Sequence, residues 1–344
     1  MTRLSLEFER PGELAATAPP EARGLERDGV RLLVTDAVGN VHRAFRDLPA
    51  LLRPGDLLVV NESATLPASL PAIGPAGRFR LNLSTDYGGG VWLAEPRRDF
   101  GTPGPVEIVP GVPVRSGQVR FYPIAPYPGI ERLWFFRVEG ALADRLAAHG
   151  EPIRYGYVER SFPLPTYQTV FARVPGSAEM PSAGRPFTPR LLEALNERGI
   201  GVAPLVLHAG VSSLESEPGD ASLPPMYPEP FDVPAATAER VNATHEAGGR
   251  VVAVGTTVIR ALETAWEGCR VVPRRGFTQL VVRPGRPVRA VDGLITGLHD
   301  SRTSHLALLF GFADERRVRE AYREAVRERY LWHEFGDSHL LWAA

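Results

Sequence analysis

The sequence predicts an α/β fold in which a main α/β domain is interrupted by an inserted small β-barrel. At 344 residues the chain exceeds the length at which a single core usually stops growing. From about Ile73 to Gly140 short apolar runs are broken by glycine and proline, which is typical of barrel strands. Beyond about residue 165, helix and strand patterns alternate. We expect a main domain of residues 1–70 and 151–344, and a barrel of residues 71–150.

Two apolar runs predict the first strands of the main sheet. They are Val30 to Thr35, and Asp56 to Asn61 after the turn signal Pro54-Gly55. A short helix from Leu142 to His149 follows the barrel segment, and Gly150 marks its end. The predicted barrel strands include Val91 to Ala94, Val106 to Val109 and Leu133 to Val138.

Helix and strand patterns then alternate along the second half of the chain. Thr188 is placed to cap a helix that has Pro189 at its first position, ends at Gly199 and leads into a strand from Val202 to Leu207. The later predicted elements are a helix from Pro234 to Ala247, a strand from Val251 to Val254, a helix opened by Thr256 and Thr257, two helices from Thr303 to Phe312 and Asp314 to Arg329, and an aromatic tail from Tyr330 to Trp342.

Composition excludes several classes of function. The net charge of −1 gives no global basic field of the kind that drives nucleic-acid affinity, although a local basic patch stays open. The longest apolar runs fall far short of the roughly 20 residues that a membrane-spanning helix needs. The N-terminus has no apolar signal region, and the single cysteine, Cys269, cannot form an intrachain disulfide. We therefore expect a cytoplasmic protein with no membrane role.

The run from Val251 to Thr257 is the clearest candidate for ligand binding. A buried strand delivers a glycine and two hydroxyls to a helix start, where free N–H groups and the helix dipole favour a carboxylate or another polar ligand. An ordinary helix cap has the same appearance, so both interpretations stay open. Arg260 and Glu263 follow one turn apart and are spaced to pair with each other.

Three further residues are candidates for chemistry. Glu179 is a carboxylate among small residues in a glycine-rich loop, where a ligand can approach the backbone closely. His208 ends a predicted strand, the position at which α/β proteins place ligand-binding groups, and His299 follows another apolar run. A structural role is the more common one for each of them on composition alone.

Several familiar motifs are absent. The chain has no GxGxxG fingerprint, no P-loop and no GxSxG elbow. The sequence therefore does not support the hypothesis of an ordinary dehydrogenase, kinase or hydrolase. His333, Glu334, Asp337 and His339 gather in the tail, but their spacing matches no helical metal-ligand motif. We expect no metal site.

Taken together, the motifs resemble the S-adenosylmethionine:tRNA ribosyltransferase-isomerase family of queuosine biosynthesis (the QueA family) over essentially the whole chain. In order they include Pro54-Gly-Asp-Leu-Leu-Val-Val-Asn, Tyr167-Gln-Thr-Val-Phe-Ala, Pro181-Ser-Ala-Gly, Phe187-Thr, Leu207-His-Ala-Gly, Val251-Val-Ala-Val-Gly-Thr-Thr, Arg260-Ala-Leu-Glu and Asp292-Gly-Leu-Ile-Thr. The number and order of these motifs identify the chain as a divergent member of the family.

The resemblance implies a fold and an activity. Members have an α/β domain interrupted by a small β-barrel, and they use S-adenosylmethionine as a co-substrate without a metal. They move its ribosyl group onto an aminomethyl-deazaguanine at the tRNA wobble position and release adenine and methionine. We therefore expect a transferase-isomerase with tRNA as its partner, acting as a monomer.

The resemblance also implies site residues, since such a reaction needs a base beside the sulfonium, an acid for the departing adenine and polar groups for the co-substrate. The expected catalytic residues are Glu179, His208, Glu229 and His299. The expected residues for S-adenosylmethionine are Tyr167, Gln168, Ser182, Gly184, Phe187, Thr188, Gly210, Gly255, Thr256, Thr257 and Arg260, with Tyr167 and Phe187 placed to stack on a purine.

The chain departs from the family pattern at several motif positions. Where the family has two arginines, the run Asn61-Glu-Ser-Ala-Thr-Leu-Pro-Ala-Ser has none, and three family histidines are replaced elsewhere. Lost positive groups would weaken phosphate contacts more than packing. Two alternatives therefore stay open: a paralogue that uses S-adenosylmethionine with a small-molecule acceptor, and a non-catalytic S-adenosylmethionine-binding protein.

Overall fold

The computed structural model describes residues 8–98, 104, 106–211, 226–301 and 303–343. The main domain is built on a nine-stranded sheet in the order β17-β13-β12-β3-β14-β18-β19-β1-β2. The central strands β12, β3, β14 and β18 run parallel, whereas β13, β17 and β2 join antiparallel toward the edges. The strands are β1 (Arg31–Thr35), β2 (Asn40–Ala44), β3 (Leu57–Asn61), β12 (Gly201–Leu207), β13 (Glu229–Val233), β14 (Val251–Val254), β17 (Arg274–Thr278), β18 (Gly293–Gly297) and β19 (Ser338–Trp342).

Helices cover both faces of this sheet because its strands are apolar on both sides. Within β3, Leu57 and Val59 belong to one buried cluster and Leu58 and Val60 to the other, as the alternation of side chains along a strand requires. The first cluster packs under α4 (Ala235–Glu246), α5 (Thr256–Thr264), α6 (Ser304–Phe312) and α7 (Glu315–Arg327), and the second under α1 (Leu48–Leu51) and α3 (Pro189–Glu197).

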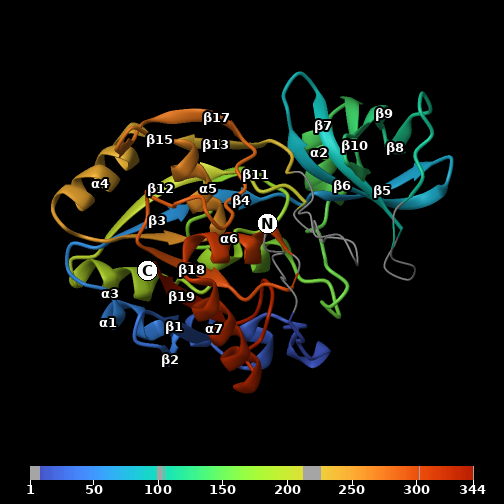
Figure 1. Cartoon of the computed structure of the whole chain (residues 1–344). Coiled ribbons are helices and arrows are strands. Elements are labelled where there is room, and N and C mark those ends of the chain that lie inside the picture. Colours follow the sequence, from blue (N-terminus) through green and yellow to red (C-terminus); the bar gives the residue numbers. More distant parts are fainter. Residues whose placement is uncertain (1–7, 99–103, 105, 212–225, 302, 344) are drawn as a thin grey trace.

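The predicted inserted barrel is present as a closed barrel in the order β10-β7-β6-β5-β8-β9, and it lies to one side of the main sheet (Figure 1). Its own core contains Leu81, Phe121 and Phe136, which are fully buried. The strands are β5 (Ser69–Gly74), β6 (Gly77–Asp86), β7 (Val91–Arg97), β8 (Val114–Ser116), β9 (Val119–Tyr127) and β10 (Ile130–Glu139), followed by α2 (Leu142–His149). The domain boundaries at residues 70/71 and 150/151 stay a prediction.

The strand predicted from Val106 to Val109 is wrong. This segment forms no strand, and Val109 accepts a turn hydrogen bond from the backbone N–H of Val112 at 3.2 Å. Pro110 has no N–H to offer to a neighbouring strand, and Gly111 adopts a positive φ of 77° in the turn. Ile108 is buried against the barrel core instead.

The predicted helix and strand signals of the second half are confirmed. The hydroxyl of Thr188 caps α3 by accepting the N–H of Leu191 at 3.2 Å, and Gly199 has a φ of +72° after the helix end. The aromatic tail holds one strand that the pattern did not predict, β19, which lies between β18 and β1. It is almost entirely buried, so it shows no alternation of polar and apolar residues.

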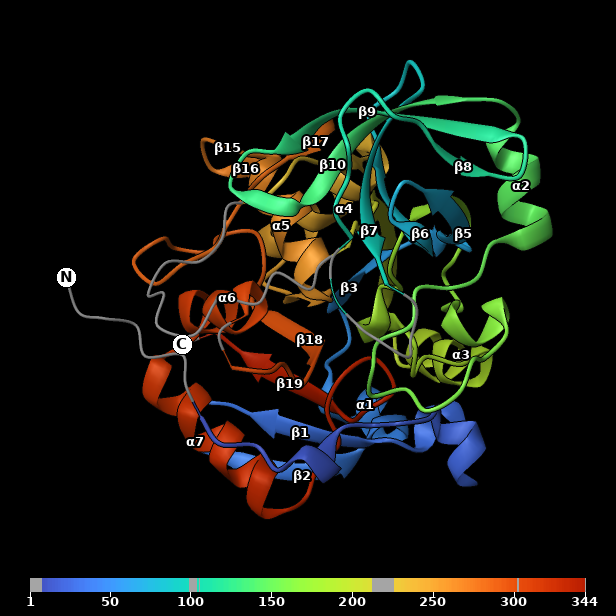
Figure 2. The ribbon, with the colours of Figure 1, turned by 90° about the vertical axis from the view of Figure 1, so that its right-hand side faces the viewer.

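Two short β-ribbons accompany the main sheet and the barrel. A two-stranded parallel ribbon joins β4 (Ser63–Thr65) to β11 (Val174–Ser177) next to the carboxyl end of β3. A second small ribbon pairs β15 (Trp266–Glu267) with β16 (Arg270–Val271). In Figure 2, α5, β3 and β18 lie between the barrel strands and the edge of the sheet formed by β1 and β2. No helix among the described residues is long and apolar enough to cross a membrane.

Candidate active site

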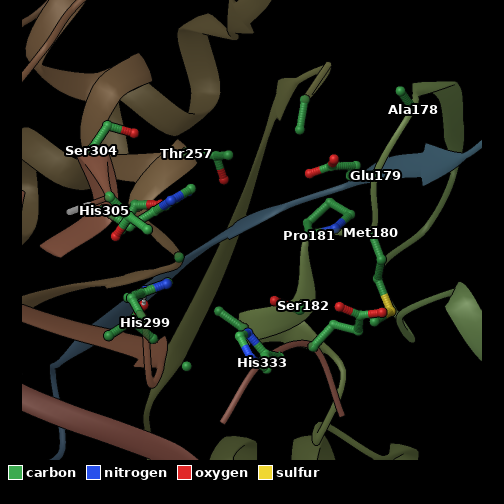
Figure 3. A pocket seen from close by; sticks show the side chains of 18 of the residues that line it. Ala178, Glu179, Met180, Pro181, Ser182, Thr257, His299, Ser304, His305 and His333 are labelled. Atoms are coloured by element: carbon green, nitrogen blue, oxygen red, sulfur yellow. Dashed lines mark hydrogen bonds between the residues drawn. The ribbon is translucent and has the colours of Figure 1, made fainter. Parts of the chain in front are cut away.

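A cavity of about 230 Å³ lies where β14 and β18 end. Carboxyl ends of parallel strands are the usual ligand site of open α/β sheets, since the backbone there is free of helix and strand partners. Residues from many separate parts of the chain line the cavity. Figure 3 shows Thr257, Ser304, His305 and His299 on one side and Glu179 and Met180 on the other.

The first side of the cavity, here called the helix wall, consists of Gly255, Thr256, Thr257, Arg260, His299 and His305. Gly255 has φ +102° and ψ 151°, a conformation that glycine adopts without strain, and it turns β14 directly into α5. The first backbone N–H groups of α5 therefore meet the cavity together with the positive end of the helix dipole.

Arg260 is the buried cation of the helix wall and is only 8% exposed. Its Nη1 forms an ion pair with Glu229, and its Nε donates to the carbonyl of Leu280 at 3.0 Å. Glu229 also accepts the N–H of Gly210 at 2.8 Å. The second amino group of Arg260, Nη2, is buried and has no hydrogen-bond partner in the described part of the chain.

The predicted pairing of Arg260 with Glu263 is wrong. The carboxylate of Glu263 instead accepts two backbone N–H groups, from Arg289 at 2.7 Å and Ala290 at 2.8 Å. It thereby anchors the segment before β18, while Arg260 extends from α5 toward Glu229 at the start of β13. The two side chains serve different partners although they lie one turn apart.

Two stacked imidazoles complete the helix wall. The rings of His299 and His305 lie 4.7 Å apart between centroids at an angle of 12°, and His299 Nε2 shares a hydrogen bond of 2.7 Å with Thr296. Burial lowers the pKa of His299 well below its ordinary value, and burial with the nearby Arg260 charge lowers that of His305 to about 4. Both rings are therefore neutral at physiological pH.

The opposite side, here called the carboxylate wall, consists of Tyr155, Tyr157, Glu179 and Glu334. The hydroxyl of Tyr155 donates to Glu179, and that of Tyr157 donates to Glu334. The two phenol rings stack with centroids 5.6 Å apart and planes 7° apart, and His333 stacks on the other side of Tyr157 at 4.1 Å.

Charge and burial set the protonation of this wall. Burial, reinforced by the charge of Glu179, raises the pKa of Glu334 to about 7, and the hydrogen bond from Tyr157 pulls it back only in part. Burial and the adjacent carboxylates raise the pKa of both tyrosines far above 10, so the phenols stay protonated donors.

The structure brings together many of the predicted site residues. Those that line the cavity come from the 3₁₀ turn before β11, the loop after β11, the start of β13, the β14–α5 junction and the segment after β18. They are Tyr167, Glu179, Ser182, Glu229, Gly255, Thr256, Thr257, Arg260 and His299. His208, Gln168, Gly184, Phe187, Thr188 and Gly210 do not line it.

His208 and Gln168 hold neighbouring loops in place. The ring of His208 bonds Ser63 through Nδ1 at 2.7 Å and packs so tightly on Gly176 that any side chain there would overlap it. Burial lowers its pKa. Gln168 accepts the N–H of Thr65 at 3.0 Å and donates to the carbonyl of the same residue at 2.8 Å.

Phe187 is fully buried between Phe45 and Phe171, whose ring centroids lie 5.0 and 5.1 Å away. Protein therefore covers the ring that we expected to stack on a purine. Gly184 and Thr188 belong to the same packed region, where Thr188 caps α3. Gly210 is needed for close approach, because a side chain there would overlap the hydroxyls of Tyr227 and Ser84.

Sequence reasoning missed Tyr155, Tyr157, His305 and the cavity role of Glu334. Tyr155 and Tyr157 follow α2 in a segment without helix or strand, and no motif marks them. Residues 155–158 form a turn closed by the N–H of Val158 and the carbonyl of Tyr155 at 3.0 Å, so no strand or helix periodicity in the sequence marks the two tyrosines. Among the described residues, no group of three or more His, Cys, Asp or Glu side chains is arranged to hold a metal ion.

Proteins of one named family are similar to this chain over nearly its whole length. The family model described as "Queuosine biosynthesis protein" matches residues 4–341. An S-adenosylmethionine:tRNA ribosyltransferase-isomerase of Thermus thermophilus is 39% identical over 343 residues, covering 94% of this chain and 96% of the relative. The protein of the same name from Rubrobacter xylanophilus is 40% identical over 351 residues and covers 98% and 96%.

A solved structure adds the fold. The crystal structure of the S-adenosylmethionine tRNA ribosyltransferase of Thermotoga maritima superposes with a TM-score of 0.55 at 27% identity, over 98% of this chain and 99% of that one. The similarity in sequence and in fold thus spans both the sheet that forms the cavity and the inserted barrel. The chain belongs to the queuosine biosynthesis protein family.

Proposed function

We propose that this chain is an S-adenosylmethionine:tRNA ribosyltransferase-isomerase that transfers the ribosyl group of S-adenosylmethionine to a 7-aminomethyl-7-deazaguanine in tRNA. The observation that carries the proposal is the convergence of family-motif residues on one cavity: Glu179, Glu229, Arg260 and His299 lie far apart in the sequence and all line it. The full-length similarity to relatives of that name supports the same activity. Neither alternative gains support from these relatives.

The helix wall is the proposed site for the methionine carboxylate of S-adenosylmethionine. Arg260 Nη2 is a buried donor without a partner among the described residues, and such a donor costs about 1–3 kcal/mol if it stays unsatisfied. A carboxylate would accept from it and from the first N–H groups of α5. Thr256 and Thr257 add hydroxyls for the amino acid or the ribose.

Glu229 keeps the binding site electrically balanced. Its carboxylate neutralises Arg260 within the protein, so the cavity offers hydrogen bonds from a fixed guanidinium rather than an unpaired buried charge. We assign Glu229 to positioning Arg260, which differs from the catalytic role expected from the family resemblance. Glu179 on the opposite wall faces the space where the sulfonium and ribose would lie.

The same proposal covers the partner and the location of the enzyme. The tRNA acceptor would enter from solvent to bring its wobble base to the cavity, and the protein would act in the cytoplasm as a monomer. Ser182, next to Glu179 in the cavity lining, and the neutral His299 are placed to bond polar groups of the substrates. No step of this scheme uses a metal.

Adenine release tests the proposed function. Purified protein is incubated with S-adenosylmethionine, with and without tRNA that carries the aminomethyl-deazaguanine base, and adenine and methionine are measured by chromatography. We expect release only with the modified tRNA. Release with a small-molecule amine but not with tRNA would establish the paralogue instead. Binding of S-adenosylmethionine without any release would indicate a non-catalytic protein.

A further inference from the structure

The carboxylate wall holds two acids, Glu179 and Glu334, each of which is bonded to a tyrosine. Glu179 follows β11 and Glu334 precedes β19, so segments 155 residues apart in sequence, by subtraction of their numbers, place them on one cavity. Each accepts a hydrogen bond from one tyrosine of the stacked pair, Tyr155 for Glu179 and Tyr157 for Glu334. The stack therefore fixes the positions of both carboxyl groups relative to each other.

The two acids share a local field. Each raises the pKa of neighbouring tyrosines, and the charge of Glu179 acts on Glu334. The side chains that act on Glu334 are Tyr157, Glu179 and Arg185, and Arg185 is itself ion-paired with Glu21. Burial and the charge of Glu179 raise the pKa of Glu334 to about 7, so Glu334 holds a proton up to a higher pH than a free glutamate does.

Among the described residues that line the cavity, His299, His305 and Glu229 do not supply such a proton. His299 and His305 are buried and neutral, with pKa values below the physiological range, so they carry no spare proton at pH 7. Glu229 forms an ion pair with Arg260 and accepts a backbone N–H. An acid that is protonated at neutral pH and faces the cavity is found, among the described residues, on the carboxylate wall.

We propose that Glu334 is the general acid and Glu179 the general base of the ribosyl transfer, with Tyr155 and Tyr157 as positioning residues. The assignment rests on the proposed function and gives it two named proton carriers. A base and an acid on one wall would act on the same ribose, one at the carbon beside the sulfonium and the other at the departing nucleobase.

The proton that Glu179 takes up is balanced by the proton that Glu334 gives away. Glu179 takes a proton from the carbon beside the sulfonium, and the C–H electrons form a double bond to the next ribose carbon, whose bond to the ring oxygen breaks. The electrons of that C–O bond form a carbonyl at the carbon that carries adenine, the C–N electrons leave with the nucleobase, and Glu334 gives the nucleobase a proton. Glu179 is then protonated and Glu334 ionised. The transfer of one proton from Glu179 to Glu334 restores the starting protonation states.

The test compares Glu334→Gln and Glu179→Gln with the wild type and with Glu159→Gln, a control at an exposed glutamate two residues beyond Tyr157. Adenine release, the affinity for S-adenosylmethionine and the exchange of deuterium from D₂O into the carbon beside the sulfonium are measured. We expect Glu334→Gln to lower kcat by about 10²–10⁴-fold and to leave affinity within a few-fold. Glu179→Gln should lose the deuterium exchange as well.

The pH profile separates an acid from a merely structural residue. Wild-type kcat should fall as the pH rises through the pKa of Glu334, and Glu334→Gln should lose this alkaline limb. Wild-type kcat in Glu334→Gln would overturn the assignment while the proposed function stood, whereas an inactive wild type would overturn the proposed function. If Glu334→Gln fails to fold, Glu334→Asp replaces it: an alkaline limb at reduced kcat supports the acid, and its absence overturns it.

Discussion

The two walls of the cavity differ in the kind of structure that builds them. The helix wall stands on a strand-to-helix junction, so its N–H groups and Arg260 take positions that the sheet and α5 determine. The carboxylate wall is assembled from a segment after α2, a loop after β11 and the tail before β19. Binding groups thus lie on regular elements and proposed proton carriers on loops.

This difference also appears in the charges. The helix wall presents a paired cation and neutral imidazoles, whereas the carboxylate wall presents two acids bonded by phenols. A sulfonium substrate with a carboxylate tail would lie across the cavity with its anion at the helix wall and its cation near the acids. The comparison therefore predicts that substitutions on the two walls separate binding from chemistry.

The largest effect is expected at Arg260. Arg260→Met removes the cation and leaves Glu229 buried without its partner, which should cost roughly 3–5 kcal/mol of unfolding free energy. It should also weaken S-adenosylmethionine binding by roughly 100-fold, since a charge-assisted hydrogen bond is lost. Calorimetric binding and urea unfolding measure the two effects.

A double variant separates stability from binding. Arg260→Met with Glu229→Gln removes both charges, so most of the lost stability should return while the affinity stays low. Affinity close to that of the wild type in the double variant would show that Arg260 does not contact the substrate. The helix wall would then be a structural support and not the binding side.

The walls should respond to pH in opposite directions. Burial lowers the pKa of His305 to about 4, so the unfolded chain binds a proton first, and stability falls as the pH drops from about 6.5 toward 4. Burial raises the pKa of Glu334 to about 7, so stability falls as the pH rises from about 4.5 to 7. Each group should change the unfolding free energy by roughly 2–3 kcal/mol over its range.

Two variants measure these opposite slopes by urea unfolding. His305→Asn should reduce the loss of stability between pH 7 and 5, and Glu334→Gln should be more stable than the wild type at pH 8. Identical pH dependence in the wild type and both variants would mean that neither group titrates as its burial implies. The two walls would then not differ in protonation.

A smaller effect is expected at Tyr157, which sharpens the role of the carboxylate wall. Tyr157→Phe keeps the ring stack and removes the hydroxyl that bonds Glu334. Since this bond lowers the pKa of Glu334, its loss should move the alkaline limb of kcat/KM up by about half to one pH unit. Tyr155→Phe, which removes the other hydroxyl of the stacked pair, is the matched comparison. An alkaline limb of kcat/KM that stays unchanged in Tyr157→Phe would show that Tyr157 does not set the pKa of Glu334.

Sequence patterns predicted the helix wall better than the carboxylate wall, and the reason is physical. The sequence indicates Gly255, Thr256 and Thr257 because a buried strand followed by glycine and hydroxyls has a required local geometry. Arg260 was assigned to the site through the family resemblance, since its spacing alone predicted a pairing with Glu263. Glu334 was noticed only within a polar tail, since its partners Tyr155 and Tyr157 come from a distant segment. Loop-to-loop contacts leave no periodic signal in a sequence.

The same contrast applies to the fold. Thr188 and Gly199 predicted α3 because caps depend on local backbone geometry. The strand β19 forms through tertiary pairing with β18 and β1, and the turn at Val109 forms because of Pro110. The pattern of apolar residues in the sequence reveals neither cause. Phe187 is a motif residue that is fully buried, which shows that motif residues can serve packing as well as the site.

The smallest effect is expected at Phe187, where a motif residue lies away from both walls. Phe187→Leu should lower the unfolding free energy by about 1 kcal/mol, because part of its contact with Phe45 and Phe171 is lost and the site collapses only in part. Affinity for S-adenosylmethionine and kcat should stay within twofold of the wild type, since protein covers the ring. Loss of affinity at unchanged stability would place a purine at this ring, and the cavity would then extend beyond the two walls.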